Sequence, residues 1–194
     1  MPLNHTSQYA ELTDEQFGII GRLVVEWSNI EFLLGVLLSR LLFTPEFLGR
    51  VYTDEMNASR VQAAVQKAVA IHKNRYGSRV VPSETLDEIV KLNVDIEKFR
   101  GMRNKFSHFC WCRSNDEEIF GSGLSGFVPP SKRLDKDSMQ LSVAELRDIY
   151  KGAYELVERL SKVIETLPET DEEKSLTTAS TRTGFSAGAP KPAG

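Results

Sequence analysis

Several features that are common in proteins are scarce in this chain of 194 residues, and each absence excludes a class of protein. There are two cysteines, Cys110 and Cys112, which is too few for the disulfide framework of a small secreted domain. The most apolar stretch, residues 32–43, is twelve residues long and contains Arg40, whereas a membrane span needs about twenty apolar residues. The N-terminus lacks the basic and apolar segments of a signal peptide. The sequence therefore predicts a soluble, cytoplasmic protein with no membrane segment.

Acidic residues are missing from one long segment, although the net charge of the whole chain is only −3. Residues 56–83 contain no Asp or Glu, and a second basic cluster surrounds residues 98–113. Separated charges of this kind can form a basic face for nucleic acid, although an ordinary solvated surface is the alternative. The residues that we assign to an RNA-binding face are Arg60, Lys67, Lys73, Arg75 and Lys105.

Four segments have apolar residues at helical spacing, and their ends carry start and stop signals for helices. The first begins with a capping box, Thr13 with Gln16, and the last begins with a second one, Ser142 with Glu145. The expected helices run from Thr13 to Phe43, from a cap at Thr53 to Tyr76, from Ser83 to His108 and from Ser142 to Pro168. The pattern predicts an all-α bundle of four or five helices.

The remaining segments lack this periodicity. Residues 109–140 predict a long irregular insertion before the last helix, with a short hairpin over 109–120 and any strands confined to about 109–128. Residues 1–12 are expected to be flexible, and residues 169–194 are too polar and too rich in Ser, Thr, Gly and Pro to fold. The domain is therefore expected to span residues 13–168.

Polar residues gather at the end of the third predicted helix. Arg100, Asn104 and His108 are spaced i, i+4, i+8 and share one row, and Arg103 and Ser107 form the row beside it. One interpretation is that a cation, an amide and an imidazole form a site here. The alternative is that these cationic side chains only interact with the C-terminal end of the helix dipole.

The segment Arg103-Asn104-Lys105-Phe106-Ser107-His108 resembles the signature of the HEPN superfamily. That signature is an arginine, a polar residue and a histidine four to six residues after the arginine, late in a long helix of an all-α bundle. The layout of residues 13–167 is also similar, with Trp27 and Glu31 in the first helix and Trp111 after the motif. Ser107 departs mildly from the pattern, because a small residue, often alanine, is common there.

The resemblance implies a function. Many HEPN proteins are metal-independent endoribonucleases of toxin, phage-defence or RNA-processing systems, while others are non-catalytic modules that bind RNA, a nucleotide or a partner protein. It implies that Arg103, Asn104 and His108 are the catalytic residues, that no metal or cofactor takes part, and that an antitoxin or a nucleotidyltransferase could be a partner. Arg100, Ser107 and Glu31 would support the site.

The chemistry of these side chains suits RNA cleavage. Histidine can remove the 2′-hydroxyl proton near neutral pH, and the planar fork of arginine matches two phosphate oxygens. Asn104 could orient the imidazole or bind a phosphate oxygen. Cleavage also needs an acid for the leaving 5′-oxygen, and each chain offers one credible histidine, so a twofold dimer is expected. The third interpretation, besides an enzyme and a binding module, is a helical interaction protein with a purely structural arginine row.

Two further features of the sequence bear on its chemistry. Glu31 falls on the apolar stripe of the first helix, so it is either a buried carboxylate paired with Arg100 or Arg103, or an exposed glutamate at the rim. An extended chain could place Cys110, Cys112 and His108 on one face. A structural zinc site has four ligands, however, and the only other candidate is the remote His72. We therefore expect no metal site. No glycine-rich phosphate loop or nucleophile elbow is present.

Overall fold

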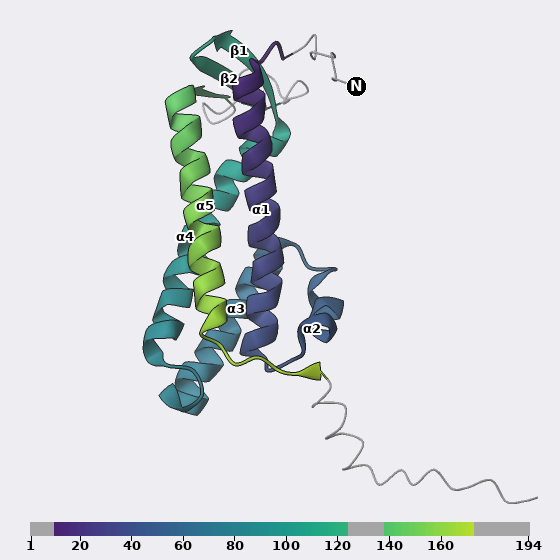
Figure 1. The fold of residues 1–194 in the computed structure, drawn as a ribbon, viewed down its shortest axis with the longest axis vertical. Coiled ribbons are helices and arrows are strands. Elements are labelled where there is room, and N and C mark those ends of the chain that lie inside the picture. Colours follow the sequence, from purple (N-terminus) through teal and green to yellow (C-terminus); the bar gives the residue numbers. More distant parts are fainter. Residues whose placement is uncertain (1–9, 124–137, 173–194) are drawn as a thin grey trace, which may run out of the picture.

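The structure is a computed structural model that describes residues 10–123 and 138–172. These residues form a long helical bundle with a small sheet across one end (Figure 1). The five α-helices are α1 (Asp14–Leu41), α2 (Glu46–Thr53), α3 (Ala58–Ile71), α4 (Ser83–His108) and α5 (Val143–Glu165). A π-helical turn, η1 (His72–Tyr76), and a 3-10 turn, η2 (Gly77–Arg79), connect α3 to α4. The predicted bundle is confirmed.

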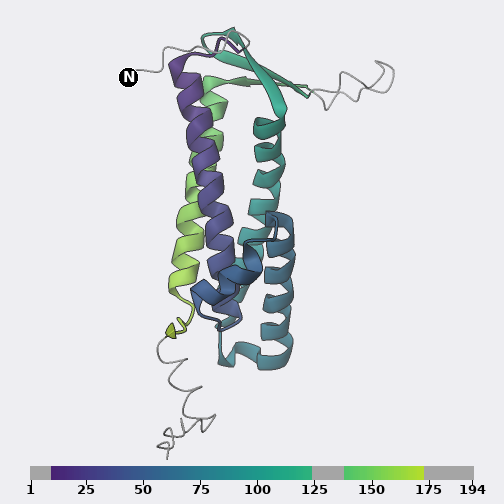
Figure 2. The ribbon, with the colours of Figure 1, turned by 90° about the vertical axis from the view of Figure 1, so that its right-hand side faces the viewer.

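Helices α1 and α5 begin at the two capping boxes predicted from the sequence. Thr13 accepts a hydrogen bond from the Gln16 backbone at 3.2 Å, and Ser142 accepts one from the Glu145 backbone at 3.2 Å. In both boxes the side chain three residues on also accepts a bond from the backbone of the capping residue. The two helices run side by side (Figures 1 and 2), and Glu15 near the start of α1 pairs with Arg147 of α5.

The predicted start of the second helix is wrong. Thr53 is not an N-cap but the last residue of a separate short helix, α2, and α3 begins later, where the Asn57 side chain accepts a bond from the Arg60 backbone at 3.0 Å. Two glycines let α2 lie against α1: a Cβ on Gly49 would come within 1.9 Å of Ser39 Oγ, and a Cβ on Gly35 within 3.2 Å of Thr53 Oγ1. Close packing of α2 on α1 was not visible in the hydrophobic pattern.

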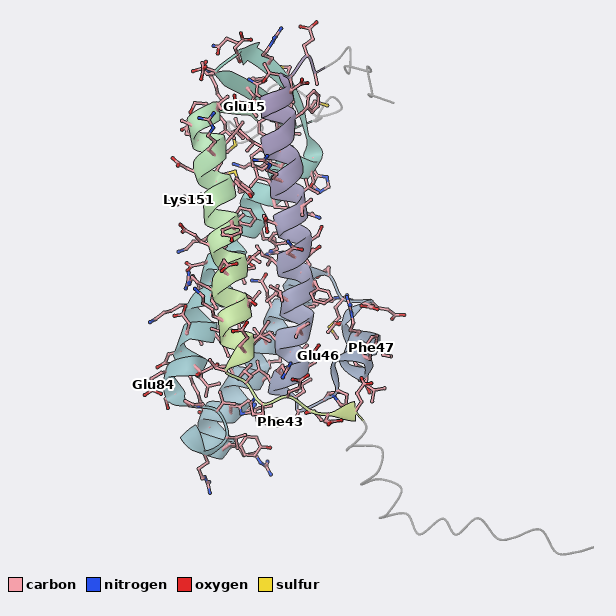
Figure 3. All side chains as sticks on the ribbon, in the orientation of Figure 1. Glu15, Phe43, Glu46, Phe47, Glu84 and Lys151 are labelled. Atoms are coloured by element: carbon pink, nitrogen blue, oxygen red, sulfur yellow. The ribbon has the colours of Figure 1, made fainter. Side chains whose placement is uncertain are left out.

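Helix α2 turns an apolar side away from the bundle. Phe47 is 78% exposed and lies on the outer side of α2 (Figure 3), and Leu48, Val51 and Tyr52 are also exposed. No single helix in the described ranges is long and apolar enough to cross a membrane, although the bent pair α1 and α2 passes that test of length and composition when taken together.

The expectation of an all-α protein is wrong in one respect, because the structure also contains a small sheet. Strands β1 (Phe109–Asn115), β2 (Glu118–Gly123) and β3 (Ser138–Ser142) pair antiparallel in the order β1-β2-β3. The hairpin is confirmed, but β3 lies beyond residue 128, and β2 continues past residue 120 through Gly121 to Gly123. The cross-strand bonds of β2 outweigh the low strand propensity of glycine here. Residues 124–137 of the predicted insertion lie outside the described residues.

The start of α1 fastens the sheet to the bundle. Gln16 is fully buried, and its Nε2 donates to the Asn115 and Asp116 carbonyls at 3.2 and 3.1 Å. Residues 10–12 were predicted to be flexible, yet Leu12 is buried and the Ala10 carbonyl accepts a bond from the Arg113 backbone at 3.1 Å. Residues 1–9, and residues 173–194 of the predicted tail, lie outside the described ranges.

The buried side chains form two clusters along the bundle. The larger one fills the lower half, where α1, α3, α4 and α5 pack around Leu34, Ile89 and Leu160. The smaller one lies under the sheet and includes Leu23, Phe106 and Ile119. Phe99 packs against both clusters, so α4 is supported along its length and its last turn is held at the sheet end.

Candidate functional site

Helix α4 carries every residue of the motif and places it at the sheet end of the bundle. The helix begins after Pro82, and Phe106 on its last turn is buried under the sheet. It ends at His108, and β1 begins at Phe109 with no residue between them. The motif is therefore the junction between the bundle and the sheet.

Arg103 faces α1. Its guanidinium carbon lies 5.5 Å from the ring centroid of Trp27, which is a cation–π distance, and the arginine is half-buried. One guanidinium nitrogen, Nη1, lies 3.4 Å from Oδ1 of the neighbouring Asn104. Trp27 is only 2% exposed, and its indole Nε1 has no hydrogen-bond partner. The sequence placed Trp27 in the first helix but gave no sign that it would support the arginine.

Asn104, Ser107 and His108 are exposed. Within the described part of the chain, the imidazole of His108 takes part in no hydrogen bond, ion pair or ring contact. Since each residue of an α-helix turns by about 100°, Arg103 and His108 leave α4 about 140° apart. The structure thus gives the arginine and the histidine different directions within one chain.

The supporting residues do not form the contacts considered from the sequence. Glu31 is exposed and makes no ion pair in the described ranges, which agrees with the rim alternative and not with the buried one. Arg100 is half-buried and is held by Glu97 of its own helix through Nη2 and, at 3.1 Å, through Nε. The salt bridge is local to α4 because the two residues are i, i+3 neighbours.

Trp111 braces the end of α4 from the sheet side. Its ring stacks on Phe106 with centroids 5.0 Å apart, and its indole Nε1 donates to the Phe106 carbonyl at 3.3 Å. Gly121 lies opposite Trp111 in the β1–β2 register, and a Cβ there would come within 2.6 Å of the indole ring. The indole ring occupies the space that a side chain at position 121 would fill.

Four of the five basic residues assigned to RNA binding lie on other elements than the motif. Arg60 and Lys67 are exposed on α3, and Lys73 and Arg75 are exposed on η1, at the end of the bundle opposite the sheet (Figures 1 and 2). Lys73 is paired with Asp87 at 2.6 Å, and this contact lowers the pKa of that carboxyl. Lys105, half-buried on the last turns of α4, is the one member of the set beside the motif.

The described residues contain no group of three or more His, Cys, Asp or Glu side chains placed to bind a metal ion. Cys110 and Cys112 are free and exposed on β1. His72, the remote fourth ligand considered for zinc, is buried at the other end of the bundle, where its Nε2 lies 2.8 Å from the Leu41 carbonyl.

Three pockets among the described residues have linings that do not include Arg103, Asn104 or His108. One lies between α1, α2 and α3 and has Glu31 in its wall. Another lies between α4 and α5 and contains Phe99 and Met102, one residue before Arg103. A single cleft that holds the three motif residues stays a prediction.

Comparison of the chain with models of protein families, with curated proteins and with solved structures gave no match. The features of the chain that bear on function are therefore the motif and the contacts of its side chains.

Proposed function

We propose that the protein is a metal-independent endoribonuclease of HEPN type, with Arg103, Asn104 and His108 at its site. The observation that carries the proposal is the contrast between two side chains of one motif. His108 is exposed and has no partner among the described residues, so its ring nitrogens are available to exchange protons. Arg103 is held against Trp27 as a positioned cation.

The proposed reaction uses the 2′-hydroxyl of the RNA as the nucleophile. His108 removes the proton of this hydroxyl, the 2′-oxygen attacks the adjacent phosphorus, and the bond from phosphorus to the 5′-oxygen breaks. A protonated imidazole gives its proton to the leaving oxygen. Arg103 binds the charged phosphoryl oxygens during the step, and Asn104 holds the imidazole or a phosphoryl oxygen. The products carry a 2′,3′-cyclic phosphate and a 5′-hydroxyl.

A second copy of the chain completes this site in the proposal. The reaction needs one base and one acid, and each chain supplies one exposed motif histidine. The opposed directions of Arg103 and His108 on α4 support the same idea, because a twofold axis can bring the histidine of one copy to the arginine of the other. The partner expected in solution is therefore a second copy of this protein, with RNA as the substrate.

The decisive experiment is RNA cleavage in EDTA with wild-type protein and the His108→Ala variant. We expect full activity in EDTA and a loss of about 10²–10⁴-fold in the variant, the usual contribution of a general acid–base group. His5→Ala is the matched control, because it removes a histidine outside the motif and should leave the rate unchanged. Wild-type activity in His108→Ala, or loss of wild-type activity in EDTA, would contradict the mechanism.

The second candidate is a non-catalytic module of the same type that binds RNA, a nucleotide or a partner protein. It is favoured by one observation, namely that Arg103 and His108 leave α4 about 140° apart, so that one chain alone does not bring the guanidinium and the imidazole together. The same experiment separates the two candidates if RNA binding is measured beside cleavage. Wild-type protein that binds RNA but does not cleave it, with binding weakened by Arg103→Ala, would support the module.

A further inference from the structure

The pocket between α1, α2 and α3 has a chemical character that the proposed reaction does not use. Its volume is about 300 Å³, and its floor is formed by small or aliphatic residues, among them Gly35, Ala58 and Val61. The polar wall consists of Ser28, Glu31, Arg50, Thr53 and Asp54. A cavity with an apolar floor and a few convergent polar groups is the usual form of a small-ligand site.

Apart from the Arg50 guanidinium, the free polar side-chain atoms of this pocket are hydrogen-bond acceptors. The Glu31 carboxylate has no partner in the described part of the chain. The Ser28 hydroxyl donates its proton to the Val24 carbonyl at 3.1 Å, and the Thr53 hydroxyl donates to the Arg50 carbonyl at 3.5 Å. Both hydroxyl oxygens therefore keep lone pairs for a ligand but no free proton. The matching ligand presents several N–H or O–H donors along one edge.

The pocket also offers a flat surface. The guanidinium carbon of Arg50 lies 4.5 Å from the ring centroid of Phe32, and both side chains line the wall. A planar ring can stack on an arginine or phenylalanine of this kind, as unpaired bases do in RNA-binding proteins. Arg50 is partly neutralised by Asp54 at 3.6 Å, so with Glu31 the wall carries a net negative charge. That charge disfavours a phosphate and favours an uncharged ring.

The pocket lies close to the proposed catalytic arginine. Trp27, which contacts Arg103, and Glu31 are i, i+4 neighbours on α1, one turn or about 6 Å apart along the helix. Figure 2 faces the side of the bundle that carries α2, and α1 and the C-terminal half of α4 border this side above α2. A nucleotide in the pocket can thus be joined to a phosphate at Arg103.

We propose that this pocket binds a guanine base of the RNA substrate, an inference that rests on the proposed function. The base stacks on the Arg50–Phe32 pair, and the Glu31 carboxylate accepts hydrogen bonds from its N1–H and N2–H groups. Guanine presents these two donors side by side, which matches the two oxygens of a carboxylate. Adenine and cytosine each present a single amino group beside an acceptor nitrogen, and uracil presents one N–H between two carbonyls, so each would face a carboxylate with an acceptor.

The test is equilibrium binding of the four ribonucleoside 5′-monophosphates to wild-type protein and to Glu31→Gln. We expect GMP to bind at least tenfold more tightly than AMP, CMP and UMP, and the variant to lose this preference, because an amide supplies one acceptor in place of two. Comparing nucleotides that share a phosphate cancels the effect of removing a negative charge. Glu55→Gln is the matched control, since Glu55 is an exposed carboxylate in the α2–α3 turn that does not line the pocket.

Equal binding of all four nucleotides, or a GMP preference that survives in Glu31→Gln, would overturn the inference. So would the absence of measurable binding. This result is independent of the cleavage experiment, because binding of a mononucleotide does not require His108. A GMP preference in a protein that cleaves no RNA would support the pocket and contradict the nuclease, whereas cleavage by His108 without a GMP preference would do the reverse.

Discussion

Arg103 and Trp27 lie on different helices, and the guanidinium carbon of the arginine is 5.5 Å from the centroid of the indole. Helix α1 thereby orients a side chain that belongs to the motif of α4. In the proposed enzyme, Trp27 is a positioning residue: it touches neither RNA nor the reacting atoms, and it acts by limiting the directions that Arg103 can take.

Replacing Arg103 with Lys is expected to lower cleavage by about 10²-fold or more, because an ammonium group cannot reproduce a bidentate fork on phosphate. Thermal unfolding should change little, since lysine can also lie over Trp27. The measurement is the single-turnover rate on one RNA. Arg147→Lys is the matched control, as Arg147 lies outside the motif and pairs with Glu15. Equal rates for wild type and Arg103→Lys would refute the bidentate role.

Gly49→Ala is expected to destabilise the protein by about 1–3 kcal/mol, because the new methyl group would overlap Ser39 where α2 packs on α1. Chemical denaturation measures this loss. The double variant Gly49→Ala with Ser39→Gly removes the overlapping side chain and should recover part of the stability. Gly18→Ala, where a Cβ meets nothing within 4 Å, should instead stabilise α1 by about 0.5–1 kcal/mol. A neutral Gly49→Ala variant would contradict the close packing.

Gly121→Ala is expected to displace the Trp111 ring, since its Cβ would lie 2.6 Å from a ring carbon. The cost should be about 1–3 kcal/mol in unfolding free energy. Because Trp111 donates to the carbonyl of Phe106, two residues before His108, cleavage should fall as well. Near-ultraviolet circular dichroism reports the ring, and an unchanged spectrum with unchanged stability would show that the indole does not depend on this glycine.

Arg159→Met is expected to weaken the contact between α5 and α4, where Arg159 bonds Glu88 at 2.7 Å and Asp95 at 3.1 Å. The hydrogen bond from Arg159 lowers the pKa of Asp95. A lowered pKa in the folded state stabilises the protein above the ordinary pKa of aspartate, and this contribution is lost as pH falls through the lowered value.

The groups are partly exposed, so the expected loss at pH 7 is modest, about 1 kcal/mol. The difference in unfolding free energy between wild type and Arg159→Met should shrink as the pH falls below about 4. Urea denaturation at pH 7 and pH 3 measures it. A difference that grows on acidification would show that the carboxylates are not stabilised by the arginine.

The local signals in the sequence were enough for the long helices. Two capping boxes marked the starts of α1 and α5, and Ser83 after Pro82 marked the start of α4. Helix α2 was missed because Thr53, followed by two acidic residues, has the form of an N-cap, whereas the close contact of Gly49 with Ser39 holds α2 against α1 from a distance in the sequence. Strand β3 was missed because it is paired only through β2.

The place of the motif in the fold was predictable from the sequence, but the contacts of its side chains were not. Helical spacing placed Arg103, Asn104 and His108 on the last turns of one helix, as observed. The side chains that contact the end of α4 come from other helices and strands, and no local sequence pattern predicts such contacts. The contact of Trp27 with Arg103 joins two helices that are far apart in the sequence. The contact of Trp111 with Phe106 forms because β1 folds back over the end of α4. Glu31 was unusual on its apolar stripe, but the pocket it lines is created by α2, which the sequence pattern did not predict.

The direct passage from α4 into β1 has a consequence for engineering the protein. His108 and Phe109 are consecutive, so the histidine has no flexible residue on either side to absorb a change in length. One residue inserted between them would shift the register of β1 against β2 or rotate the imidazole by a large angle around the helix. A flexible linker or label introduced into this protein is therefore best kept away from the junction of α4 and β1, which is expected to tolerate no change in length.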